Sequence, residues 1–221
     1  MTFEDELLAV AANRLFVFDM DGTLLINTTA CIEIAKVSGT LDELHVLEQK
    51  FAAREIDAFC FAQNIGALWG MVDEQVVREA FEATPKLTNI KAVIDLIRRG
   101  GGKSCLITMS PDFYANLFYE YGFDFIGASQ FPRGANEEVK REHILTPKDK
   151  AVIVRRWCDR LGFELNGCVA FGDSMSDYLL FKELEHTVSI NGDPTLKDLA
   201  RYHYEGSDLH DAFLIICNAL A

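Results

Sequence analysis

The sequence predicts an α/β protein that contains a doubly wound parallel sheet and a small helical unit inserted after the first strand. Two observations lead to this fold class. Short apolar strands alternate with helical segments along most of the chain, and the stretch 27–84 shows helical pattern only. Because a helix at each crossover joins parallel strands, helices should cover both faces of the sheet. We therefore expect an α/β core from residues 1–26 and 85–221, and a helical cap from residues 27–84.

The first elements follow from charge and hydropathy. Residues 3–12 carry acids in the first turn and helix formers afterwards, which predicts a helix ahead of the apolar strand 15–18. Apolar residues then recur at helical spacing through the inserted unit. Its four large aromatic residues at near-helical spacing are predicted to form the core of this unit rather than a surface for substrate. They are Phe51, Phe59, Phe61 and Trp69.

After Pro85 the pattern alternates between the two types of element. Helices are predicted over residues 89–98, 111–121, 151–161 and 209–221, and strands over residues 104–107, 123–128, 168–171 and 187–190. The polar stretch 130–146 is predicted to be an exposed hairpin or loop.

Composition limits the class of protein. The 221 residues are 49% hydrophobic and 25% charged, as in an ordinary globular chain. The apolar runs are shorter than the ~18 residues that cross a bilayer, and the first residues lack the positive start of a signal peptide. Six cysteines without a CxxC pair favour a reducing, cytoplasmic location over a zinc site. A net charge of −13 argues against nucleic-acid and anionic-membrane partners.

Polar groups cluster where predicted strands end. They are Asp19–Thr23, Thr108–Pro111, Lys150 at the start of a helix, and Gly172–Asp177. Ligands of such sheets bind beyond the carboxyl ends of the strands, so these groups should meet there. Acids gathered in one place repel each other unless a cation lies among them. Mg²⁺ suits this position because it takes carboxylate and carbonyl oxygens and holds a phosphate oxygen as well.

The motifs DMDGT and GDSMSD, with a threonine and a lysine between them, resemble the haloacid dehalogenase-like (HAD) superfamily of hydrolases. The segments TMSPDFYANLFYEYGFDFIGAS and FGDSMSDYLLF are most similar to its phosphoserine-phosphatase-like branch, subfamily IB type, which has a helical cap. The resemblance implies a Rossmann-like core. It also implies Mg²⁺-dependent hydrolysis of a small-molecule phosphate monoester through an aspartyl-phosphate.

The resemblance also implies roles for the acids. Asp19 is the expected nucleophile. Asp21 is expected to protonate the leaving oxygen and then to activate water, while its main-chain carbonyl reaches the metal. The expected metal ligands are Asp19, Asp21 and the side chain of Asp173. Asp177 is expected behind them or bound through water, and Ser174 is expected to orient the acids.

Other residues are expected to support the phosphate and the turns. Lys150 supplies positive charge to the phosphate, and Lys148 is the alternative lysine. Gly22 allows a tight turn, and Gly172 allows close approach of the backbone. Thr23, counted with the phosphate-binding group, is expected to fix the second acid of the first motif by hydrogen bonding.

The second motif offers two hydroxyls for a phosphoryl oxygen. Thr108, with the Met109 amide, is favoured because it follows the predicted strand directly. Ser110 is the alternative. It stands where it would cap a helix opened by Pro111, which has no N–H to donate.

The residues expected to recognise an amino acid are missing, which narrows the expected substrate. Phosphoserine phosphatases hold their substrate with an acid just after the first motif and with a cap arginine. Here those positions fall at Thr28 and at Asn64 or Ile65, with Glu33 and Arg54 displaced, so phosphoserine is disfavoured.

The acid at position 21, which dehalogenases of this superfamily lack, favours phosphoryl over carbon chemistry. Two alternatives to a phosphatase stay open. One is a phosphomutase or phosphotransferase of the same superfamily, and the other is a non-catalytic regulator that binds phosphate esters.

Overall fold

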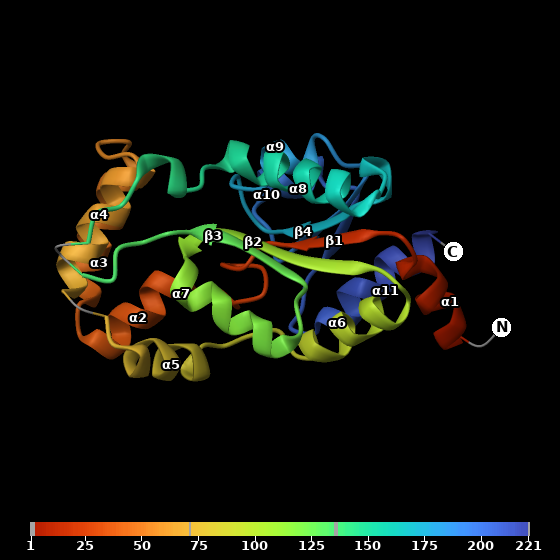
Figure 1. Cartoon of the computed structure of the whole chain (residues 1–221), viewed down its shortest axis with the longest axis horizontal. Helices are drawn as coiled ribbons and strands as arrows, with labels where there is room; N and C mark the ends of the chain where they lie inside the picture. The colour runs from red at the N-terminus through yellow and green to blue at the C-terminus, as the bar shows by residue number, and fades with distance from the viewer. Residues whose placement is uncertain (1–2, 71, 135–136, 221) are drawn as a thin grey trace.

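The computed structural model describes residues 3–70, 72–134 and 137–220. Within these residues six strands form one parallel sheet in the order β3-β2-β1-β4-β5-β6, with helices on both faces (Figure 1). The strands are β1 Leu15–Phe18, β2 Lys103–Pro111, β3 Phe125–Ser129, β4 Val169–Gly172, β5 His186–Ile190 and β6 Tyr202–Tyr204. The predicted fold class is confirmed. The predicted outer limits at residues 1 and 221 lie outside the described part of the chain.

Strand β1 lies at the centre of the sheet and is buried along its whole length. The ring of Phe18 stacks on that of Phe171, with centroids 4.7 Å apart. In the parallel register Phe18 also pairs with Leu106 of β2. The carboxyl ends of β1, β2 and β4 therefore lie side by side, which places the predicted polar groups at one edge of the sheet.

Two helical layers cover the sheet (Figure 1). One face carries α8 Pro147–Leu161, α9 Tyr178–Phe181 and α10 Pro194–Leu199, and the other carries α1 Phe3–Ala11, α6 Ile90–Arg99 and α11 Leu209–Leu220. Helix α8 begins before its predicted start because Thr146 and Asp149 form a capping box and Pro147 occupies the first turn. The short 3-10 helix η3 spans Leu165–Gly167.

The predicted helix 111–121 is two elements, α7 Asp112–Ala115 and the 3-10 helix η1 Asn116–Tyr121. Strand β6 has no counterpart among the predicted elements. It is only three residues long, and none of the three is buried. A strand this short at the sheet edge lacks the continuous apolar run that identifies a buried strand.

Between β1 and α6 the described residues form four helices at one end of the molecule (Figure 1), which we call the helical unit. They are α2 Ala30–Ser38, α3 Leu41–Ala52, α4 Ala58–Trp69 and α5 Glu74–Ala83. The two connections to the core are paired, because Ile26 donates to the carbonyl of Pro85 and Leu87 to that of Leu24, each at 2.9 Å. The domain limits at 27 and 84 stay a prediction.

The stretch 130–146 differs from its prediction. Its described residues contain the 3-10 helix η2 Arg141–His143 and no strand, so the hairpin alternative is wrong. Phe131 and Ile144 are buried, so the segment is not exposed throughout. The segment packs along the helical unit in space. Val72 donates to the carbonyl of Arg133 at 2.8 Å, and Arg141 pairs with Asp57 at 2.5 Å.

No helix in the described ranges combines the length and apolar character needed to cross a membrane. All six cysteines are free thiols, and five of them are buried as the sequence indicates. The structure adds one proximity, since the Sγ atoms of Cys158 and Cys168 lie 3.1 Å apart.

Candidate active site

Asp19 extends the central strand by one hydrogen bond before the chain turns away. Its N–H donates to the carbonyl of Phe171 at 2.9 Å, and the N–H of Leu24 then closes the turn on the carbonyl of Met20 at 2.9 Å. Gly22 lies in this turn with a φ of +75°, and a Cβ on it would lie 2.2 Å from a carboxylate oxygen of Asp173. The turn therefore requires glycine both for its backbone angle and for its contact with Asp173.

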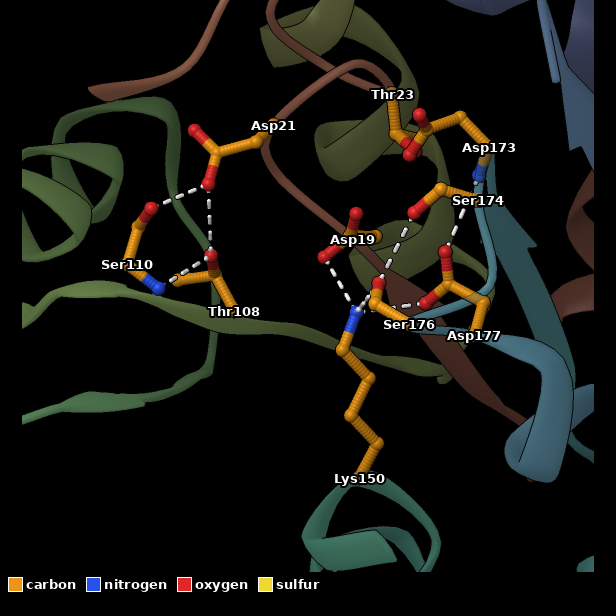
Figure 2. A network of polar contacts seen from close by, with 10 residues as sticks. All are labelled: Asp19, Asp21, Thr23, Thr108, Ser110, Lys150, Asp173, Ser174, Ser176 and Asp177. Atoms are coloured by element: carbon orange, nitrogen blue, oxygen red, sulfur yellow. Dashed lines mark hydrogen bonds and ion pairs between the residues drawn. The ribbon is translucent and has the colours of Figure 1, made fainter. Parts of the chain in front are cut away.

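Lys150 joins the carboxylates in the centre of the site (Figure 2). Its Nζ lies 2.6 Å from Oδ1 of Asp19, 2.7 Å from Oδ1 of Asp177 and 3.0 Å from Oγ of Ser176, and the residue is only 1% exposed. Burial alone would lower the pKa of Lys150, but Asp177 and Asp19 raise it above its ordinary value, so the amine stays charged. Lys148 is exposed and contacts none of them.

Three acids lie close together, and two of them are bonded to that lysine. Carboxylate oxygens of Asp19, Asp173 and Asp177 all lie within 4.8 Å of one another. Burial raises the pKa of Asp173 to about 9, and the charges of Asp19 and Asp177 add to the rise. One lysine cannot neutralise three acids, and hard carboxylate oxygens are the ligands that Mg²⁺ prefers, so the residues present fit a magnesium ion.

The cluster of three acids differs in membership from the predicted set of metal ligands. The carboxylate of Asp177 belongs to this cluster, and its expected place behind the metal ligands or bound to the metal through water stays a prediction. Asp177 also accepts from the N–H of Asp173 at 3.2 Å, and a Cβ on Gly172 would meet it at 2.4 Å, which explains that glycine. The carboxylate of Asp21 is not part of the cluster, and the predicted contact of its main-chain carbonyl with the metal stays a prediction.

Two supporting hydroxyls bond to other partners than expected. The Thr23 hydroxyl donates to Oδ1 of Asp173 at 3.1 Å, so the predicted bond from Thr23 to Asp21 is wrong. This hydrogen bond orients Asp173 instead of Asp21. Ser174 lies 3.3 Å from the Ser176 hydroxyl and contacts no acid through it.

Asp21 is held from two sides, by Ala30 and by the hydroxyls of the second motif, of which Figure 2 shows the hydroxyls. Its Oδ1 accepts the N–H of Ala30, the first residue of α2, at 2.7 Å. Its Oδ2 accepts the hydroxyl of Ser110, and Thr108 lies 3.4 Å away. Burial raises the pKa of Asp21, while these hydrogen bonds oppose the rise. The contact with α2 is absent from the sequence prediction, although Thr29 is a recognisable N-cap there.

Both hydroxyls of the second motif lie beside Asp21, and they are linked, since the N–H of Ser110 donates to Oγ1 of Thr108 at 3.1 Å. Helix α7 begins at Asp112 with Pro111 in the cap position. The predicted role of Ser110 as a helix cap is therefore wrong. Met109 lines the adjoining cavity.

A cavity of about 240 Å³ extends from the two acids of the first motif and the hydroxyls of the second motif to the helical unit. Its other walls come from the helical unit and from the 130–146 segment, and they include Cys31, Glu48, Phe51, Phe61, Phe131 and Ile144. Phe61 packs against the core as expected and Trp69 is buried in it, whereas Phe51 is exposed. Both Phe51 and Phe61 also border the cavity. Phe131 and Ile144 are missing from the prediction because a polar loop gave no sign of buried positions.

The displaced candidates for amino-acid recognition do not reach this cavity. Glu33 is buried, accepts from Thr28 at 2.5 Å and pairs with Lys36 at 2.7 Å. Arg54 is exposed and has a φ of +60°. Neither lies among the lining residues, and among the described residues that line the cavity there is no lysine, arginine or histidine.

Comparisons with known proteins agree with this architecture. A model of the haloacid dehalogenase-like hydrolase family matches residues 16–182. No curated protein matches the chain by sequence. A solved structure described as a phospho-aspartyl intermediate analogue of phosphoserine phosphatase has a TM-score of 0.74 and 20% identity, covering 93% of this chain and 99% of that one.

Two further solved structures are similar. A HAD family hydrolase from Salmonella enterica subsp. enterica serovar Typhi has a TM-score of 0.79 and 16% identity, covering 91% of this chain and 71% of that one. A probable phosphoserine phosphatase from Vibrio cholerae has a TM-score of 0.76 and 17% identity, covering 97% of this chain and 68% of that one. At these identities the likeness establishes a common fold.

Proposed function

The chain belongs to the haloacid dehalogenase-like hydrolase family, and from this premise we propose that it is a Mg²⁺-dependent phosphatase. The proposed reaction is hydrolysis of a small-molecule phosphate monoester through an aspartyl-phosphate on Asp19. One observation carries the proposal. Asp19 follows the central strand, borders the cavity and is held at 2.6 Å by the buried Lys150 beside Asp173 and Asp177.

In the first step the Asp19 carboxylate attacks phosphorus and the bond from phosphorus to the ester oxygen breaks. Asp21 donates its proton to that leaving oxygen, a role that suits a carboxyl group whose pKa is raised by burial. Lys150, with Thr108 and the Met109 amide, stabilises the phosphoryl oxygens during transfer.

In the second step water attacks the aspartyl-phosphate. Asp21, now a carboxylate, takes the proton of that water, phosphate leaves and the Asp19 carboxylate is restored. Asp19, Asp173 and the Asp21 carbonyl would hold Mg²⁺, with Asp177 close by. When bound, Mg²⁺ supplies positive charge to the phosphate and to the crowded carboxylates.

A phosphate-release screen tests the function. The purified protein with Mg²⁺ is incubated without any acceptor alcohol, with sugar phosphates, phospho-amino acids, nucleotides and phosphorylated biosynthetic intermediates. We expect Mg²⁺-dependent release of inorganic phosphate from at least one class. In a parallel reaction that contains an added sugar, transfer to that sugar without release of phosphate would indicate a phosphotransferase. Inertness toward the whole panel would favour a binding regulator.

Replacing Asp173 by Asn tests the metal site. Because the substitution removes an anionic ligand, the Mg²⁺ concentration for half-maximal activity should rise at least about tenfold. A Mg²⁺ titration of phosphate release measures it. The matched control is Asp198→Asn, an exposed aspartate on α10, which should leave the titration unchanged. An unchanged Mg²⁺ requirement in Asp173→Asn would show that Asp173 is not a ligand.

A further inference from the structure

Three phenylalanine residues line the part of the cavity that the helical unit and the 130–146 segment form. The rings of Phe51 and Phe61 have centroids 5.2 Å apart at 38°, and those of Phe61 and Phe131 have centroids 6.4 Å apart at 74°. All three residues line the cavity. Rings inclined to one another in this way present both faces and edges to an enclosed group, and an aromatic face attracts a cation.

Glu48 of α3 lies in the same wall. Its carboxylate makes no hydrogen bond or ion pair with any residue that the structure describes, although it is only partly exposed. Burial raises the pKa of Glu48, while His45, one turn earlier on α3 and exposed, lowers it. A partly buried carboxylate that makes no hydrogen bond or ion pair is stabilised when a cation binds beside it.

The other polar groups of this wall are neutral or already occupied. Burial raises the pKa of the Cys31 thiol well above its ordinary value, so the thiol stays protonated. The Thr29 hydroxyl accepts the N–H of Ile32. Among the described residues that the helical unit contributes to the lining, Glu48 therefore carries the single formal charge, and it is negative.

We propose that this aromatic wall and Glu48 bind an organic ammonium group, so that the substrate is a phosphate monoester whose alcohol carries a cationic amine and no carboxylate. The inference rests on the proposed phosphatase function, because the phosphate end of the ester must lie at Asp19. The cation contacts the rings of Phe51, Phe61 and Phe131 and is balanced by Glu48. A carboxylate at this place would face Glu48 without a cationic partner, which explains why the phosphoserine-binding residues are missing.

Matched esters test the charge directly. Phosphocholine and O-phosphoethanolamine carry the cation, and 3,3-dimethylbutyl phosphate has the shape of phosphocholine with carbon in place of the charged nitrogen. O-phosphoserine adds a carboxylate to the amine. We expect kcat/KM for phosphocholine to exceed that for the neutral analogue by at least about tenfold, and O-phosphoserine to be the poorest amine ester.

Variants locate the preference. Glu48→Gln should lower the ratio of kcat/KM for phosphocholine to that for the neutral analogue by at least about fivefold. Phe51→Leu should lower the same ratio, because it keeps an apolar side chain but removes a ring. The matched control is Glu43→Gln, which removes the same charge from an exposed position on α3 and should leave the ratio unchanged.

Failure of the inference and failure of the proposed function give different results. If the neutral analogue is hydrolysed as well as phosphocholine, or if Glu48→Gln keeps the full preference, the ammonium site is wrong and the phosphatase stands. If no ester releases phosphate, the phosphatase is wrong. In that case calorimetric titration of the Asp19→Asn protein with phosphocholine and with the neutral analogue still decides the inference, and equal affinities overturn it.

Discussion

Asp19→Asn is expected to reduce phosphate release by at least about 10⁴-fold, the order of loss that follows removal of a covalent nucleophile. The amide keeps the shape of the carboxylate. Its oxygen can still accept from Lys150, whose Nζ lies 2.6 Å from Oδ1 of Asp19 in the wild-type protein. The substitution also removes one negative charge from the group with Asp173 and Asp177. The free energy of unfolding should therefore change by no more than about 1 kcal/mol.

Covalent trapping distinguishes a nucleophile from a residue that only binds. Acid-quenched wild-type protein incubated with substrate should carry a phosphoryl group on the peptide that contains Asp19, as detected by mass spectrometry. The Asp19→Asn protein should carry none, whereas Asp159→Asn, an exposed aspartate on α8, should be labelled and active. Appreciable turnover by Asp19→Asn would refute the assignment of the nucleophile.

Lys150→Met should lower both activity and stability. Loss of the ammonium group removes positive charge from the phosphoryl site, at a cost of about 10²–10³ in kcat. It also leaves Asp19 and Asp177, each bonded to Nζ at 2.6–2.7 Å, without a cation. Breaking a buried ion pair in this way destabilises a protein by about 3–5 kcal/mol.

Urea unfolding in the presence of EDTA measures the stability change without a metal ion. The activities of the wild-type protein and of Lys150→Met are then compared without urea, after circular dichroism has shown that the variant is folded. Lys148→Met is the matched control, since Lys148 occupies the same turn of α8 but is exposed, and it should change the free energy of unfolding by no more than about 0.5 kcal/mol. Near wild-type activity in folded Lys150→Met would contradict the role of this lysine in the site.

The alternation of strands and helices was predictable because the central strands are buried on both faces. Strands such as β1, Leu15–Phe18, therefore read as continuous apolar runs, and helices between them carry caps and glycine stops. Strand β6 was not predictable, since three partly exposed residues at the sheet edge carry no such run. The start of α7 was missed by one residue, and this misplaced Ser110 as a helix cap.

The main acids of the site were predictable because parallel strands end at a common edge. The hydrogen-bond partners of individual hydroxyl groups were not predictable from the sequence. The bond from Thr23 to Asp173 joins residues 150 positions apart and depends on how β1 and β4 align and on which rotamers their neighbours leave free. Phe131 and Glu48 line the cavity through the tertiary placement of the 130–146 segment and of α3, which no local sequence pattern indicates.

The hydrogen bond from Ala30 to Asp21 limits how the protein can be re-engineered. A foreign helical unit transplanted between residues 27 and 84 would bring new residues to the lining of the cavity. It would also reposition the Ala30 amide that orients Asp21. Recombination at that junction would therefore alter proton transfer together with substrate choice. Chimeras that keep residues 28–30 and exchange only the chain beyond them separate the two properties.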